Sequence, residues 1–215
     1  MKIGIVGGTG DIGEGMAMRL SSVFDVVVGS REKEKADTTC RLTEETLKSA
    51  GRECSLAGEC NQGCVDGADV VILAIPFRHV LPTLSTLHGL EGKIVISPVN
   101  PMEKRDFFVF TPPPEGSAAL LIQKLLPDAR VCAAFNTVAA NRWKALEDEL
   151  VYSVPVCSDD EKAKQEVMAI VNRVSRLQAF NAGPLAVSSM VESLTPLVLN
   201  IARYNKMKDV GIQFC

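Results

Sequence analysis

GIVGGTGDIGEG, residues 4–15, decides the fold of this chain. It completes the apolar run Lys2–Val6, which predicts a strand, and then opens a segment of helical character. Between a strand and a helix, the spacing Gly8-x-Gly10-x-x-Gly13 is typical of a turn that holds the pyrophosphate of a dinucleotide at the helix N-terminus. Gly8 would permit the tight turn, Gly10 would let the backbone approach the phosphates, and Gly13 would let the helix pack closely on the strand.

The alternative interpretation of the same run is a purely structural turn. Gly7 and Gly15 are interpreted simply as residues that permit close packing. The residues of the turn expected to contact the cofactor are Gly8, Thr9, Gly10, Asp11, Ile12 and Gly13.

Further along the chain, short β-branched runs alternate with segments of helical character. Strands are predicted at residues 2–6, 25–28, 53–56, 70–75, 93–97, 130–134 and 151–156. Helices are predicted at residues 13–22, 32–49, 78–87, 116–126 and 159–174. This alternation predicts an α/β fold of the Rossmann type, a doubly wound and mainly parallel sheet with helices on both faces. A small C-terminal helical extension follows, in which residues 191–205 form a helix around Pro196.

Two segments stand apart from this alternation. Residues 101–115 carry a run of three prolines, Pro112–Pro114, and predict a long loop of the kind that often forms a functional lid. The apolar C-terminal helix predicts packing against the domain or, as an alternative, a homodimer interface. We take a homodimer as the default.

The tip of the second strand indicates which dinucleotide is bound. Sites that select NAD place an Asp or Glu there to hold the ribose 2'-hydroxyl. This chain has Ser30 and Arg31 instead, followed by Lys33 and Lys35. A hydroxyl beside a guanidinium offers charge-assisted hydrogen bonds to a 2'-phosphate, so NADP is favoured over NAD. For Lys33 and Lys35, a solvated basic helix start is the alternative.

Composition excludes several classes of function. The chain has 215 residues, 47% of them hydrophobic, and a net charge of -3 that offers no basic surface for nucleic acid. No apolar run is expected to reach the roughly 20 residues of a membrane helix, so we expect a cytoplasmic protein that binds neither nucleic acid nor membrane. Seven cysteines without a CxxC pair indicate neither a disulfide framework nor a metal site.

No catalytic residue is predicted. Of the two histidines, His88 lies in an expected loop, while His79 follows the fourth strand on the cofactor side and is expected to contact backbone or phosphate rather than act as a base. The pair Tyr204-x-x-x-Lys208 lies too close to the C-terminus to serve as a dehydrogenase couple. A second flat redox cofactor stacked on the nicotinamide would need little acid–base apparatus.

The chain resembles the coenzyme F420-dependent NADP oxidoreductases of methanogens and related archaea. The motifs that carry the resemblance are GGTGDIGEGMAMRL, VVVGSREKEKA, AIPFRHV, KIVISPVNP, VPVCSDD, AGPL, VESLTPLVLNI and GIQF. The resemblance implies hydride transfer between reduced coenzyme F420, a deazaflavin, and NADP by direct stacking of the two rings. It also implies an NADP-binding Rossmann domain over residues 1–180 and a small helical part over residues 181–215 that completes the cleft for the second substrate.

The resemblance assigns residues to both ligands. Beyond the glycine-rich turn, NADP would contact Ser30, Arg31, Lys35, Ile75, His79, Asn100 and Ala140. The deazaflavin cleft would be formed by Asn136, Thr137, Val138, Met207 and Val210. Asn136 stands where the family has His, and could donate a hydrogen bond to a deazaflavin carbonyl without carrying a charge. That departure leaves two alternatives open: an NADPH-dependent flavin or ferric-type reductase, and a module that senses NADP without turnover.

Overall fold

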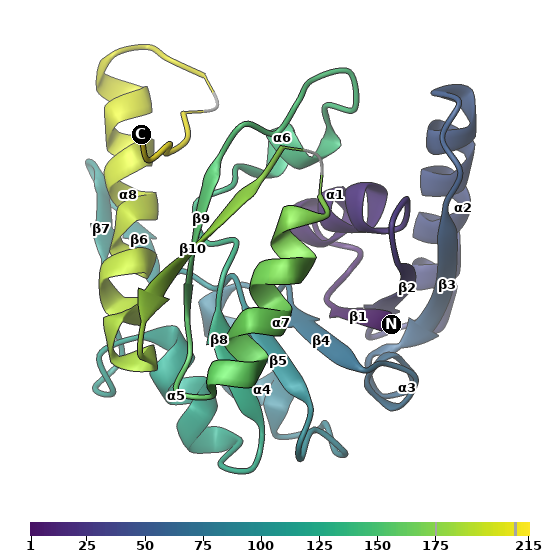
Figure 1. The fold of residues 1–215 in the computed structure, drawn as a ribbon, viewed down its shortest axis with the longest axis horizontal. Helices are drawn as coiled ribbons and strands as arrows, with labels where there is room; N and C mark the ends of the chain where they lie inside the picture. The colour runs from purple at the N-terminus through teal and green to yellow at the C-terminus, as the bar shows by residue number, and fades with distance from the viewer. Residues whose placement is uncertain (175, 209) are drawn as a thin grey trace.

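The computed structural model describes residues 1–174, 176–208 and 210–215 as a twisted sheet with helices packed on both faces (Figure 1). The order of the eight strands is β10-β9-β8-β5-β4-β1-β2-β3. They are β1 (Lys2–Val6), β2 (Asp25–Ser30), β3 (Ser55–Cys60), β4 (Val70–Leu73), β5 (Ile94–Ser97), β8 (Arg130–Ala133), β9 (Ser153–Cys157) and β10 (Gln178–Gly183). Neighbouring strands are parallel except β8 and β9, so the predicted doubly wound, mainly parallel fold is confirmed.

Alternate residues of each central strand supply two separate cores, as the two-residue repeat of a strand requires. Ile72 belongs to one core and its neighbour Val71 to the other; Ile94 and Val95 divide in the same way. The first core is covered by α1 (Asp11–Leu20), α2 (Lys33–Ser49), α6 (Ala140–Lys144) and α7 (Glu161–Asn172). The second is covered by α3 (Asn61–Asp66), α4 (Val80–Leu84), α5 (Ala118–Leu125) and the start of α8 (Ser188–Tyr204).

Several predicted boundaries and elements differ from the structure. The third strand begins at Ser55 rather than residue 53, and helix α1 begins at Asp11 rather than residue 13. The segment 78–87 forms a 3-10 turn, η1 (Phe77–His79), before the short α4. The prediction missed α3, α6 and β10, because α3 and α6 are too short to show an apolar period and β10 is a partly exposed edge strand that carries polar residues.

Residues 101–115 are not a loop throughout. They contain the antiparallel hairpin β6 (Met102–Lys104) and β7 (Phe108–Phe110), which lies beside α8 (Figure 1). The side-chain amide of Asn200 on α8 holds this hairpin, since its Oδ1 accepts from the Phe108 N–H and its Nδ2 donates to the Phe108 carbonyl, both at 2.8 Å. Tertiary contact with α8 therefore supplements a strand pair too short to be stable alone.

Helix α8 is also tied to α5 through a fully buried carboxylate. Glu192 accepts hydrogen bonds from the backbone N–H groups of Ala118 and Ala119, at 2.8 and 3.0 Å, in the first turn of α5. Burial raises the pKa of the Glu192 carboxyl to about 7, although the two hydrogen bonds favour its ionised form. Against the expectation that no such run exists, the 20 residues Leu185–Tyr204, which include η2 (Leu185–Val187), are by length and composition apolar enough to cross a membrane. A core helix passes the same test, and Glu192 shows that one side of α8 packs inside the protein.

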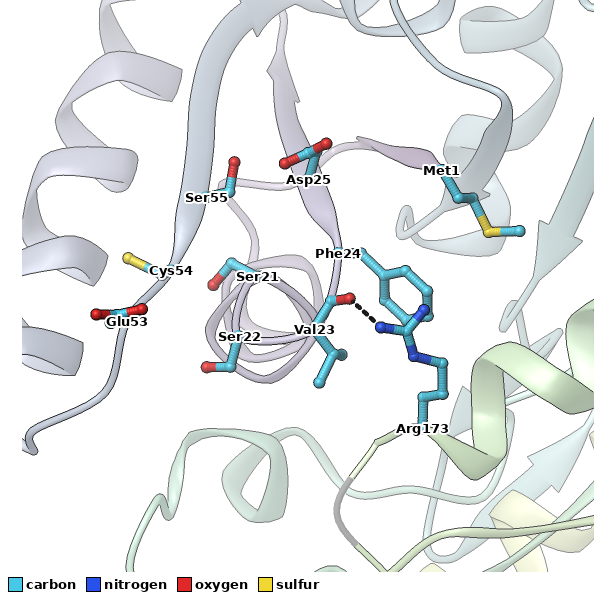
Figure 2. Close-up of a pocket in the computed structure, with 10 residues that line it drawn as sticks. All are labelled: Met1, Ser21, Ser22, Val23, Phe24, Asp25, Glu53, Cys54, Ser55 and Arg173. Carbon is cyan, nitrogen blue, oxygen red and sulfur yellow. Dashed lines mark hydrogen bonds between the residues drawn. The ribbon is translucent and has the colours of Figure 1, made fainter.

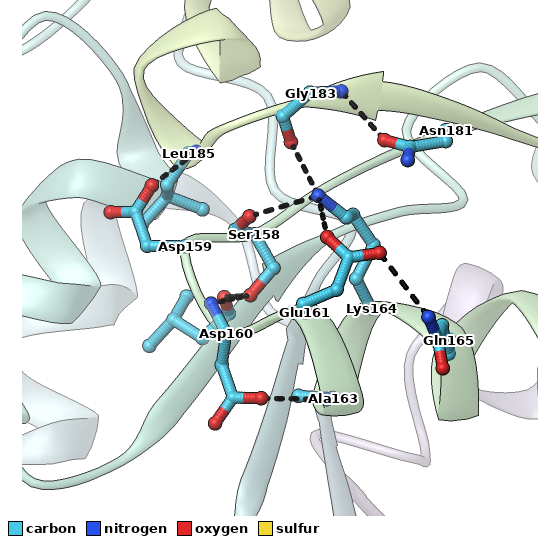
Figure 3. A network of polar contacts seen from close by, with 11 residues as sticks. Ser158, Asp159, Asp160, Glu161, Ala163, Lys164, Gln165, Asn181, Gly183 and Leu185 are labelled. Carbon is cyan, nitrogen blue, oxygen red and sulfur yellow. Dashed lines mark hydrogen bonds and ion pairs between the residues drawn. The ribbon is translucent and has the colours of Figure 1, made fainter.

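A polar network joins the end of β9 to α7 and β10 (Figure 3). The carboxylate of Asp160 caps α7 by accepting from the Ala163 N–H at 2.8 Å. The buried Lys164 ammonium lies 2.8 Å from Glu161 and 3.4 Å from the carbonyls of Ser158 and Gly183. A buried lysine is stable only with such partners, and here they hold together the region where the strand direction has reversed.

Candidate functional site

The glycine-rich turn leaves β1 and is fastened to the neighbouring strands. The N–H of Gly8 donates to the Gly29 carbonyl of β2 at 2.8 Å. The positive φ of this turn, +74°, belongs to Gly7 rather than Gly8, and a Cβ at Gly7 would lie 2.5 Å from the Ile75 side chain. The close packing expected at Gly7 is therefore confirmed, and Gly7 in addition adopts the left-handed backbone of this turn.

Gly10 and Gly13 are glycines for different reasons. A Cβ at Gly13 would lie 2.6 Å from both the Gly7 carbonyl oxygen and the Gly8 Cα, so helix packing on the turn demands glycine there. A Cβ at Gly10 would meet nothing closer than the Gly7 oxygen at 3.5 Å, an ordinary contact, and the backbone at Gly10 is extended. No packing contact therefore requires glycine at position 10. Because Gly10 has no side chain, space remains beside the N–H groups of the first turn of α1, which have no acceptor within the helix.

A cavity of about 650 Å³ opens at this point, at the carboxyl ends of β1 and β4, where the strand order reverses. This reversal is where sheets of the doubly wound type bind their ligands. Among the predicted contacts, the cavity is lined by Gly10, Asp11, Ile12, Ile75 and Asn100. Its remaining walls are Leu73, Ala74, Pro76, Phe77, Arg78, Pro98, Met102, Glu103 and Thr111.

Three residues of the cavity wall lie on the hairpin or just after it, and the sequence analysis did not name them individually. Met102, Glu103 and Thr111 belong to the segment 101–115, for which only a lid was expected. Its place directly after the carboxyl end of β5 is the feature that could have identified them, because loops at that edge border the ligand crevice.

The tip of β2 presents one hydroxyl and several cations. Ser30 is buried, and its Oγ accepts from the Glu32 N–H at 3.4 Å, while Arg31 is exposed beside it. The Lys35 ammonium lies 2.8 Å from Glu32, and this hydrogen bond holds the pKa of the Glu32 carboxyl below its usual value. The Lys33 ammonium lies 2.8 Å from the Glu59 carboxylate instead. Lys33 therefore fits the alternative of a basic residue at the start of the helix.

Residues 135–138 follow β8 in a strained conformation. Phe135 has a φ of +65°, which a bulky residue rarely adopts, and its ring packs edge-on against Trp143. The next residue, Asn136, is only 5% exposed. Thr137 and Val138 are buried as well. Strained residues cluster at ligand sites, so this segment is a candidate part of the site.

The amide of Asn136 is oriented by its neighbours. Its Nδ2 donates to the Val99 carbonyl at 3.2 Å and to Asn100 Oδ1 at 3.3 Å, and a carbonyl can only accept, which fixes the amide orientation. Asn136 Oδ1 is buried and finds no partner among the described residues. The unpartnered atom of this amide is therefore an acceptor, and a hydrogen bond from Asn136 to a deazaflavin carbonyl stays a prediction. The backbone carbonyl of Asn136 is held by Asn100 at 2.9 Å and by Thr195 of α8 at 2.7 Å.

The other predicted contacts lie further out. His79 is exposed, with its Nε2 accepting from Arg78 Nε at 3.2 Å, and Ala140 is half-buried at the start of α6. Met207 is 53% exposed just beyond α8, and Val210 is half-buried. The hydrogen bonds of the described residues do not connect Met207 or Val210 to Asn136, so their place in one cleft stays a prediction.

A second hollow, of about 560 Å³, lies at the amino ends of β1, β2 and β3 (Figure 2). Arg173 closes one side of it by donating to the Val23 carbonyl at 2.7 Å and stacking over Phe24 at 4.3 Å from the ring centre. None of the predicted site residues lines this hollow. The two hollows are at opposite edges of the sheet, and only the carboxyl edge carries the glycine-rich turn.

Comparison with known proteins agrees with this geometry. Residues 2–101 match the family described as NADP oxidoreductase, coenzyme F420-dependent. The F420-dependent NADP reductase of Methanocaldococcus jannaschii is 36% identical over 99% of this chain and 97% of its own length. The metalloreductase STEAP3 of Rattus norvegicus is 28% identical over the whole chain, which spans 40% of that protein.

The fold agrees as well. The crystal structure of a candidate F420-dependent NADP reductase from Arthrobacter sp. FB24 superposes with a TM-score of 0.81 at 22% identity, covering 100% of this chain and 99% of that one. The identity and the near-complete coverage of the Methanocaldococcus enzyme extend the match well past residue 101. The chain therefore belongs to the family of coenzyme F420-dependent NADP oxidoreductases.

Proposed function

We propose that this chain transfers a hydride between reduced coenzyme F420 and NADP, as an oxidoreductase of its family. The observation that carries the proposal is the cavity at the carboxyl edge of the sheet, which joins the uncapped first turn of α1 to the segment after β5. The family membership and the full-length similarity to an F420-dependent NADP reductase support the choice of substrates.

The residues present fit a dinucleotide. Space is left at Gly10 where a side chain would otherwise be tolerated, and Ser30 and Arg31 stand where a 2'-phosphate would need a hydroxyl and a cation. Bound together, the two ligands supply a hydride donor and a hydride acceptor, and one proton is released as NADP is reduced. The contribution of the chain is to bind, orient and exclude water.

No acid or base is assigned to the reaction. The one histidine near the site, His79, points its Nε2 to Arg78. The unpartnered Oδ1 of Asn136 offers an acceptor to an amide or ring N–H of a ligand. Direct stacking of the two rings, with alignment by the protein as the source of the rate enhancement, is the mechanism that these side chains support.

The protein mixed with NADP and reduced coenzyme F420 is expected to form NADPH and oxidised coenzyme F420 in equal amounts. Absorbance of the two products measures this, with FMN, FAD and a ferric chelate as parallel second substrates. The similarity to a metalloreductase favours the flavin or ferric-type reductase as the second candidate. Turnover with those acceptors and none with coenzyme F420 would establish it, and NADP binding without any turnover would indicate a sensor.

The same proposal includes a homodimer. Met190, Leu197, Ile201 and Tyr204 recur along one side of α8 and are exposed by 69%, 54%, 40% and 69%. An apolar stripe of this spacing is typical of a helix that packs on another helix, and a second copy would present the same stripe. Light scattering is expected to give a dimer mass, and Leu197→Lys a monomer mass with an unchanged circular dichroism spectrum. A monomer mass for the unmodified chain would contradict the dimer.

We also propose which partners this chain has and where in the cell it acts. Small-molecule cofactors are the partners, and neither nucleic acid nor a membrane is bound, since acidic and basic residues nearly balance. The site of action is the cytoplasm. Fractionation of the source cells and a nucleic-acid binding assay test both statements.

A further inference from the structure

Lys144 connects α6 to the first turn of α1. Its ammonium lies 2.6 Å from Glu14 Oε2 and 3.2 Å from Asp11 Oδ1. The hydrogen bond to Glu14 raises the pKa of Lys144 above its ordinary value, so the side chain stays charged. One cation from a distant part of the chain thus faces two carboxylates of the helix that opens after the glycine-rich turn.

These two carboxylates stand where an anion is to bind. Asp11 lines the cavity, and both acidic residues lie in the first turn of α1. Acidic side chains suit a helix N-terminus while it is empty, but they repel a diphosphate that uses the same N–H groups. Without a compensating cation, this turn would present negative charge to a negatively charged ligand.

The position of Lys144 is fixed by packing of α6 on α1. A Cβ at Gly15 would lie 2.5 Å from Trp143 Cβ, so the two helices touch at their backbones. The buried guanidinium of Arg19 donates to the carbonyls of Arg142 and Trp143 in α6 and to those of Ala145 and Asp148 just after it. Lys144 is therefore held against the first turn of α1 by contacts that do not depend on its own charge.

We propose that Lys144 is a positioning residue for NADP, which neutralises Asp11 and Glu14 so that the first turn of α1 accepts the pyrophosphate. The proposal rests on the proposed function for the identity of the ligand. Lys144 is not among the residues that line the cavity, so it acts through the two carboxylates and not by contact with the phosphates.

The test is a comparison of NADP dissociation constants by calorimetry. Lys144→Met is expected to weaken NADP binding about tenfold at 0.1 M salt, where the Debye length is about 10 Å, and far less at 1 M, where it is about 3 Å. Asp11→Asn in the Lys144→Met background is expected to restore most of the affinity. A merely structural clasp would give no such rescue, because Asp11→Asn does not rebuild a contact.

Lys124→Met is the matched control. Lys124, on α5, forms an ion pair with Glu115 at 2.7 Å, so Lys124→Met removes the same charge at another place. Equal NADP affinity for Lys144→Met and the unmodified chain would overturn this inference alone. Failure of the unmodified chain to bind NADP would overturn the proposed function and this inference together, whereas NADP binding without turnover of coenzyme F420 would overturn only the proposed reaction.

Discussion

Gly10→Ala is expected to weaken NADP binding by about 100-fold or more and to leave the fold intact. The added Cβ would meet only the Gly7 oxygen at 3.5 Å, and the backbone at Gly10, with φ -84° and ψ 167°, suits alanine. The same methyl group would occupy the side of the turn from which phosphate oxygens approach the N–H groups of α1. Loss of two charge-assisted hydrogen bonds, at roughly 1.5 kcal/mol each, gives about that factor.

Gly13→Ala is the matched control for this substitution. Its Cβ would lie 2.6 Å from the Gly7 oxygen and the Gly8 Cα, so the expected result is a lower unfolding temperature rather than a selective loss of affinity. Calorimetric titration with NADP and thermal unfolding of both variants separate the two effects. An unchanged dissociation constant for Gly10→Ala would mean that the pyrophosphate does not bind at this turn.

Arg31→Ala is expected to raise the Michaelis constant for NADP about 10- to 100-fold while the constant for NAD stays nearly unchanged. The guanidinium is exposed at the tip of β2 beside Ser30, and a hydrogen bond between charged groups contributes roughly 1.5 to 3 kcal/mol. NAD has a hydroxyl in place of the 2'-phosphate and gains little from this cation. Initial rates with each nucleotide measure the two constants.

Lys33→Ala provides the comparison for Arg31. Lys33 starts the same helix but binds Glu59 at 2.8 Å and the Gly58 carbonyl at 2.6 Å, so its removal should change the NADP constant much less. Lys35, which pairs with Glu32, is expected to have an intermediate effect because that exposed pair can open. An equal loss for NADP and NAD in Arg31→Ala would remove Arg31 from the 2'-phosphate site.

Local patterns predicted the parts of the site that lie close together in sequence. Gly8, Gly10 and Gly13 were recognised because the strand, turn and helix are consecutive, and their spacing reflects local backbone geometry. The close packing expected at Gly7 is confirmed, since a Cβ there would meet the Ile75 side chain just after β4, but the positive φ of Gly7 was not predicted. Spacing alone shows which glycines are present, but not which one takes the unusual backbone conformation.

Contacts between distant segments decided the rest. The donor and acceptor atoms of Asn136 were assigned only by Val99 and Asn100, which follow a different strand. Likewise, Lys144 reaches Asp11 and Glu14 across more than a hundred residues of chain. No periodicity in a sequence records such partners, because side-chain direction depends on packing that forms only when the sheet is assembled.

By itself, then, the sequence determined the class of the fold, the glycine-rich turn between the first strand and the first helix, and the residue types at the tip of the second strand. These features depend on hydrophobic alternation and on short-range backbone constraints, which are written into consecutive residues. Only the tertiary structure decided that residues 101–115 contain a hairpin held by Asn200, that Val99 and Asn100 orient the amide of Asn136, and that one lysine pairs with two carboxylates beside the cavity. Each of those depends on the relative placement of elements far apart in the chain, and that placement is set by burial of the two cores.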